Sequence, residues 1–80
     1  GPEFPELQNA KQYVDAAKEF LNNPPATALV KTRATGEIVA YDPPSNTFGV
    51  GTANGTPRTM FRPDTAKHGY LTNLDYYNAQ

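Results

Sequence analysis

The stretch "TALVKTRATGEIVAYDPPSNTFGVGTANGTPRTMFR", residues 27–62, decides the fold of this chain. It consists of short runs of apolar and polar residues in alternation, separated by turn-forming residues, a pattern typical of antiparallel strands. Gly36 and the pair Asn54-Gly55 suit hairpin loops, because glycine adopts positive φ without strain. The stretch therefore predicts a meander of four antiparallel strands, over residues 27–33, 37–42, 47–51 and 56–62.

An amphipathic helix is expected ahead of the meander, over residues 5–21. Pro5 suits its first turn, and Asn22-Asn23-Pro24-Pro25 cannot continue it. The apolar residues recur at three- and four-residue steps, at Leu7, Ala10, Val14, Ala17 and Leu21. Residues 63–80 form a short C-terminal segment. The predicted fold class is α+β, an N-terminal helix packed on a four-stranded antiparallel meander.

The composition indicates one small domain, residues 5–80. The chain has no cysteine and one histidine, which excludes a disulfide, a thiolate metal site and a zinc site built on histidines. No apolar run approaches the roughly 20 residues that a membrane-spanning helix needs. Residues 1–4, Gly1-Pro2-Glu3-Phe4, resemble a protease-cleavage and cloning scar and are left out of the expected fold.

The charge of the chain is unevenly distributed. Its net charge of −1 argues against a general nucleic-acid binder. Residues 1–25 carry two basic and four acidic side chains, a balance of −2, whereas residues 26–70 carry five basic and three acidic ones, a balance of +2. A small basic patch is therefore expected on the second segment.

The cations of that segment lie on predicted strands. Alternation places Lys31 and Arg33 on one face of the first strand, and Arg58, Met60 and Arg62 on one face of the last. If the helix covers one face of the sheet, the other face is free to carry cations, which could hold a phosphodiester. The alternative interpretation is that these side chains lie in water and discourage edge pairing.

His68 is the one histidine, and a group that titrates near neutral pH suits general acid or base catalysis. A lone surface histidine is more often idle. Thr59 and Thr72 are possible donors to a phosphate, although threonine is also common in strands. No phosphate-binding glycine loop, zinc-peptidase motif or serine-hydrolase motif occurs.

The tail is rich in tyrosines and amides. Tyr70, Tyr76 and Tyr77 could stack on bases, and at least two of them are expected to pack in the small core. Asn73 and Asp75 could cap a last helical turn over residues 74–78, or orient His68.

A set of residues across most of positions 29–80 carries a resemblance to a known family. They are Gly36, Val39, Tyr41-Asp42-Pro43, Asn46, Phe48, Val50, Asn54-Gly55, Arg58-Thr59, Phe61-Arg62-Pro63-Asp64, His68-Gly69-Tyr70, Thr72-Asn73 and Tyr76. On this pattern the chain resembles the C-terminal toxin domains of bacterial contact-dependent growth inhibition and related polymorphic toxin systems. The family looks like part of the barnase/EndoU/colicin/RelE ribonuclease superfamily (the BECR fold), in which N-terminal helices pack on an antiparallel sheet.

The resemblance implies a metal-independent ribonuclease without a cofactor, frequently directed at tRNA. Its implied partners are RNA and a cognate immunity protein, with no membrane. It also implies delivery as the C-terminal part of a larger secreted or cell-surface toxin that acts in the cytoplasm of a target bacterium. The implied catalytic residues are His68, Arg58, Thr59, Arg62, Thr72 and Tyr76, and the implied substrate-binding residues are Lys31, Arg33, Tyr70 and Asn73.

The alternative function is a small non-catalytic α+β module that docks a protein on the same face. The acidic net charge and the small size of the basic patch favour this alternative.

Overall fold

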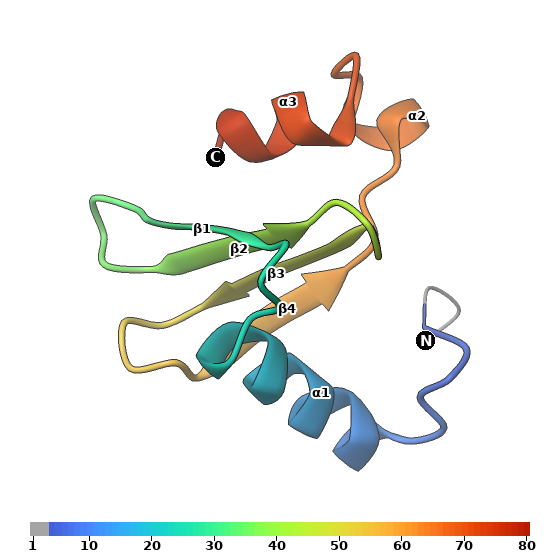
Figure 1. Cartoon of the computed structure of the whole chain (residues 1–80), viewed down its shortest axis with the longest axis vertical. Helices are drawn as coiled ribbons and strands as arrows, with labels where there is room; N and C mark the ends of the chain where they lie inside the picture. The colour runs from blue at the N-terminus through green and yellow to red at the C-terminus, as the bar shows by residue number, and fades with distance from the viewer. Residues whose placement is uncertain (1–3) are drawn as a thin grey trace.

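The computed structural model describes residues 4–80. Its strands form one antiparallel sheet in the order β1-β2-β3-β4, with α1 on one face and α2 and α3 on the other (Figure 1). The predicted class, an N-terminal helix on a four-stranded antiparallel meander, is confirmed. The elements in chain order are α1 (Ala10–Asn22), β1 (Leu29–Thr32), β2 (Ile38–Asp42), β3 (Thr47–Gly51), β4 (Pro57–Phe61), α2 (Thr65–His68) and α3 (Asn73–Asn78).

The strands follow the predicted pattern. β3 has the predicted bounds, and the other three strands lie within the predicted ranges. Gly36 (φ 92°) and Gly55 (φ 87°) both adopt positive φ in the hairpin loops, as expected. The pairing places Tyr41 opposite Phe48, and Phe48 opposite Phe61, so that aromatic side chains cross the sheet in a row.

Helix α1 begins at Ala10 and not at Pro5, which corrects the predicted start. The side chain of Asn9 accepts a hydrogen bond from the backbone N–H of Gln12 at 2.9 Å. Asparagine is among the best N-cap residues, so the helix starts where this cap satisfies a free amide. None of the helices within residues 4–80 has the length and apolarity needed to cross a bilayer.

Phe4, which was left out of the expected fold, belongs to the folded core. Its side chain is 4% exposed. Its ring meets Tyr13 edge-on at 6.4 Å, and the guanidinium of Arg62 lies 4.5 Å above it. A ring of this size is driven out of water by its apolar area. Gly1-Pro2-Glu3, the remainder of the proposed scar, lie outside the described residues.

The core on the α1 side is closely packed. A Cβ at Gly49 would lie 2.9 Å from the ring of Phe20, so the glycine permits α1 to approach the sheet. The hydroxyl of Tyr13 donates to the carbonyl of Met60 at 2.5 Å and accepts its N–H at 3.0 Å. The buried residues of this cluster are Phe4, Ala17, Phe20, Leu21, Ala40 and Met60.

The opposite face of the sheet is partly covered by α3, which corrects the expectation that it is free. Several strand residues on this face, among them Val39 and Phe48, are apolar and need a cover. Tyr77 is buried there and Tyr76 packs beside it, so the expectation that at least two tail tyrosines pack is confirmed. The buried residues of this second cluster are Val39, Tyr41, Phe48, Val50 and Tyr77.

The C-terminal segment contains two short helices. Helix α2 begins after Asp64, whose side chain accepts from the N–H of Ala66, and ends at His68, which is followed by Gly69 with φ 78°. Helix α3 is capped by Thr72, whose hydroxyl accepts the N–H of Asp75 at 3.0 Å. The cap is therefore Thr72, and not Asn73 or Asp75 as considered from the sequence.

Candidate functional site

His68, the last residue of α2, borders a pocket of about 280 Å³. The pocket lies where β4, α2 and α3 meet. Pockets for drug-sized ligands usually measure roughly 300–1,000 Å³, so this one suits a single ring or a phosphate group. Its lining consists of Phe61, Arg62, Pro63, Asp64, Lys67, His68 and Tyr76.

The imidazole of His68 is held on both its face and its edges. Its ring stacks on Tyr76 at 4.4 Å, with 17° between the planes. Nε2 lies 2.8 Å from Oδ1 of Asn73, and Nδ1 accepts the backbone N–H of Tyr70 at 3.1 Å. Because both nitrogens are engaged, the ring has a defined orientation, which general acid–base chemistry requires.

Several of the residues singled out in the sequence line this pocket or contact the ring of His68. The ring of Tyr70 lies 5.6 Å from His68 and 5.9 Å from Tyr76. Asn73 orients His68, which is one of the two roles considered for it. Arg62 lines the pocket while its guanidinium pairs with Glu6 at 3.4 Å. The structure thus brings His68, Arg62, Tyr70, Asn73 and Tyr76 together.

Two further residues of this region, Lys67 and Asn46, were given no role in the site from the sequence. Lys67 is exposed in the last turn of α2 and lines the pocket, and its position next to His68 was an available signal. Asn46 has φ 50° and accepts the side-chain N–H of Asn73 at 3.1 Å. Asparagine is the non-glycine residue that tolerates this backbone region best, so its place at the end of a proline-rich turn was also informative.

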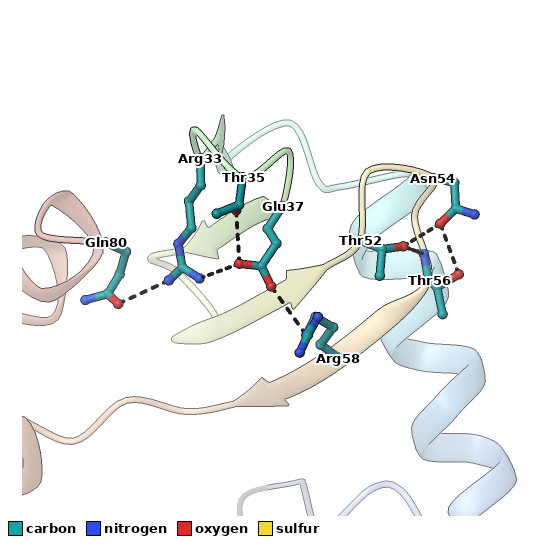
Figure 2. Close-up of polar contacts among 8 residues, drawn as sticks. All are labelled: Arg33, Thr35, Glu37, Thr52, Asn54, Thr56, Arg58 and Gln80. Carbon is teal, nitrogen blue, oxygen red and sulfur yellow. Dashed lines mark hydrogen bonds and ion pairs between the residues drawn. The ribbon is translucent and has the colours of Figure 1, made fainter.

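Arg58 and Thr59 do not line this pocket. Nε of Arg58 pairs with Glu37 at 3.3 Å, and Arg33 pairs with the other oxygen of Glu37 at 3.3 Å (Figure 2). A shift in the β3–β4 pairing beside Gly51 breaks the expected alternation at Arg58, because a bulge adds one residue to a strand. Exposed Thr59 lies opposite Val50 in the ladder.

Lys31 and Arg33 share a face of the sheet, as predicted, and fasten α3 to it. Nζ of Lys31 donates to the backbone carbonyl of Tyr77 at 2.6 Å. It also lies over the ring of Tyr77, 4.4 Å from the ring centroid. Arg33 donates to the side-chain oxygen of Gln80 at 3.3 Å (Figure 2). Both cations therefore have a structural role at the C-terminal end of the chain.

The environment shifts the ionisation of two buried tyrosines. Burial raises the pKa of Tyr41 above its usual range, and burial also raises the pKa of Tyr77. The hydroxyl of Tyr41 donates to Oδ1 of Asn46 at 2.9 Å. Tyr41 is therefore a neutral hydrogen-bond donor behind the His68 pocket.

No group of three or more histidine, cysteine, aspartate or glutamate side chains within residues 4–80 is placed to hold a metal ion. Neither a scan against protein-family models nor a search of curated proteins finds a match to this chain.

Proposed function

We propose that this domain is a metal-independent endoribonuclease of the toxin class, with tRNA as its expected substrate. The ribose 2′-oxygen attacks the adjacent phosphorus, the bond to the 5′-oxygen breaks, and the products carry a 2′,3′-cyclic phosphate and a 5′-hydroxyl. The observation that carries the proposal is the oriented ring of His68 at a pocket that Arg62 and Lys67 also line.

The residues of the pocket have separate roles in this reaction. His68 exchanges a proton with the 2′-hydroxyl or the leaving 5′-oxygen, and the hydroxyl of Tyr70 or Tyr76 serves the other transfer. Arg62 and Lys67 stabilise the additional negative charge of the phosphorane. Arg58, which is largely exposed beside Glu37, would contact a neighbouring phosphate together with Thr59, Lys31 and Arg33.

A toxin of this class also implies a partner. The domain would be delivered, as the C-terminal part of a larger secreted or cell-surface protein, into the cytoplasm of a target bacterium. A cognate immunity protein with an acidic surface would cover the His68 pocket, because opposite charges favour association with Arg62 and Lys67.

A second function, a non-catalytic protein-binding module, is favoured by one observation. The loop between α2 and α3 and the first turn of α3 expose three apolar side chains close together in sequence: Leu71 is 92% exposed, and Tyr70 in the loop and Leu74 in α3 are each 44% exposed. Neighbouring exposed apolar side chains are a common mark of protein interaction sites. In this alternative the loop, and not the pocket, is the functional feature.

Incubation of the domain with total tRNA in the presence of EDTA separates the two functions. The ribonuclease produces defined fragments that disappear with His68→Ala. Lys11→Ala is the control, because Lys11 is exposed on α1 and pairs with Asp15 one turn along the same helix. Intact tRNA at high protein concentration, or fragments that persist in His68→Ala, would rule out the proposed mechanism.

A further inference from the structure

A chain of side-chain amides connects His68 to the sheet. Asn73 bridges His68 and Asn46, with 2.8 Å from its oxygen to Nε2 of His68 and 3.1 Å from its nitrogen to Oδ1 of Asn46. Asn46 in turn donates to the carbonyl of Pro63 at 3.2 Å and accepts from Tyr41 at 2.9 Å. The histidine is thus supported through two residues by β2 and by the segment that follows β4.

The donor and acceptor of each hydrogen bond in this series of amides can be assigned from its last member, the carbonyl of Pro63. The carbonyl of Pro63 can only accept, so the side-chain nitrogen of Asn46 faces it and the oxygen of Asn46 faces Asn73. Asn73 then presents its nitrogen to Asn46 and its oxygen to His68. That oxygen can only accept, so Nε2 of His68 carries a proton.

A second contact requires the same tautomer independently. The backbone N–H of Tyr70 donates to Nδ1 of His68 at 3.1 Å, which requires that Nδ1 has no proton. The contacts with Asn73 and with the amide of Tyr70 therefore both place the proton of neutral His68 on Nε2. Nδ1 is left as the nitrogen that can accept a proton, and its contact is with the amide of an exposed loop residue.

We propose that Asn46 is a positioning residue that acts on His68 through Asn73. Asn46 fixes the orientation of the Asn73 amide, and this amide holds His68 in the Nε2–H tautomer. Nδ1 is then the atom that exchanges a proton with RNA, once the amide of Tyr70 moves away. This last part rests on the proposed ribonuclease function, whereas the control of the tautomer does not.

The backbone of Asn46 suggests the substitution that tests this role. Because its φ is 50°, Asn46→Gly removes the side-chain amide and keeps a backbone conformation that glycine adopts freely. Asn54→Gly is a matched control, since Asn54 lies in the β3–β4 turn and, among residues 4–80, its side chain bonds only to Thr52 and Thr56 of that turn (Figure 2). Circular dichroism verifies that each variant folds.

The first measurement is a long-range ¹H–¹⁵N correlation spectrum of the imidazole at pH 8. Wild type and Asn54→Gly are expected to show neutral His68 as the Nε2–H tautomer alone. Asn46→Gly is expected to show a mixture of tautomers, because the contact of Nδ1 with the amide of exposed Tyr70 then holds the tautomer without the support of Asn73. A mixture in the wild type, or an unchanged spectrum in Asn46→Gly, would overturn the proposal. If Asn46→Gly does not fold, Asn73→Ala and Asn73→Asp replace it, because only the aspartate keeps an acceptor for Nε2–H.

The second measurement is RNA cleavage by the same proteins. Asn46→Gly should lower kcat by about 10–100-fold with little change in KM, as displacement of a catalytic group does. An unchanged kcat would refute the catalytic part of the proposal. Absence of cleavage by the wild type would refute the proposed function itself, and the tautomer spectra would still decide whether Asn46 positions His68.

Discussion

Asp42 illustrates at the residue scale how a buried charge is held at the end of β2. The residue is 4% exposed, and its carboxylate accepts hydrogen bonds from Ser45 at 2.6 Å and from Thr27. These two bonds hold the pKa of Asp42 below its ordinary value. The residue thus favours the folded state only while it is ionised.

This linkage predicts an acid-dependent loss of stability. The contribution of Asp42 is complete above the unfolded pKa of about 3.9 and is lost as pH falls through the lower, folded value. Asp42→Asn should therefore lower the free energy of unfolding by about 1–3 kcal/mol at pH 7, and the difference from wild type should narrow below pH 4. Urea unfolding at several pH values measures this. A difference that stays constant down to pH 2 would contradict it.

The sequence predicted part of the residues around His68 and missed others for physical reasons. The near-neutral titration of histidine and the aromatic character of Tyr76 pointed to two residues that do meet. The contact of Arg58 with Glu37 depends on a bulge, which strict alternation does not anticipate. The role of Asn46 depends on a bond to Asn73, which is distant in sequence.

Helix α3 is the element at which the structure differs most from the fold predicted from the sequence. It covers the sheet face that was expected to be open, because Tyr77 buries itself against Phe48 and Tyr41. Helix α2 was not predicted, although its signals are local: Asp64 at the N-cap and Gly69 at positive φ after the end. Such short helices have weak periodicity, so their caps are more informative than their apolar pattern.

The cap of α3 yields a prediction for Thr72. Thr72→Ala should lower the free energy of unfolding by about 1 kcal/mol, because the N–H of Asp75 loses its acceptor. Thr72→Ser keeps a hydroxyl at the same place and should restore most of the stability. Thermal unfolding of the three proteins measures the effect. If Thr72→Ala is as stable as wild type but cleaves RNA more slowly, the residue acts on substrate and not as a cap.

The molecule as a whole is a three-layer arrangement, α1 on one face of the sheet and the C-terminal helices on the other (Figure 1). The class and order of the elements were predictable, because turn residues delimit each strand. The layer formed by the C-terminal helices was not predictable, because no local sequence pattern indicates which face of the sheet a C-terminal segment will cover. The packing of Phe4 was missed because the first residues were set aside.

Phe4 closes the α1-side core, so its loss should affect the whole domain. Phe4→Ala is expected to lower the free energy of unfolding by about 3 kcal/mol, as for other buried phenylalanines. In a domain of this size that corresponds to a decrease in Tm of roughly 12–24 °C. Differential scanning calorimetry measures the change, with Pro5→Ala, an exposed neighbour, as the control. An unchanged Tm would show that Phe4 contributes nothing to the core.

The chemistry of the RNA ends tests the central claim most directly. Fragments of tRNA produced by the wild-type domain in EDTA are analysed by mass spectrometry, beside a reaction with His68→Ala. The proposed mechanism predicts 2′,3′-cyclic phosphate and 5′-hydroxyl ends in the wild-type reaction, and no fragments with His68→Ala. Intact RNA, or fragments with 3′-hydroxyl and 5′-phosphate ends, would contradict it.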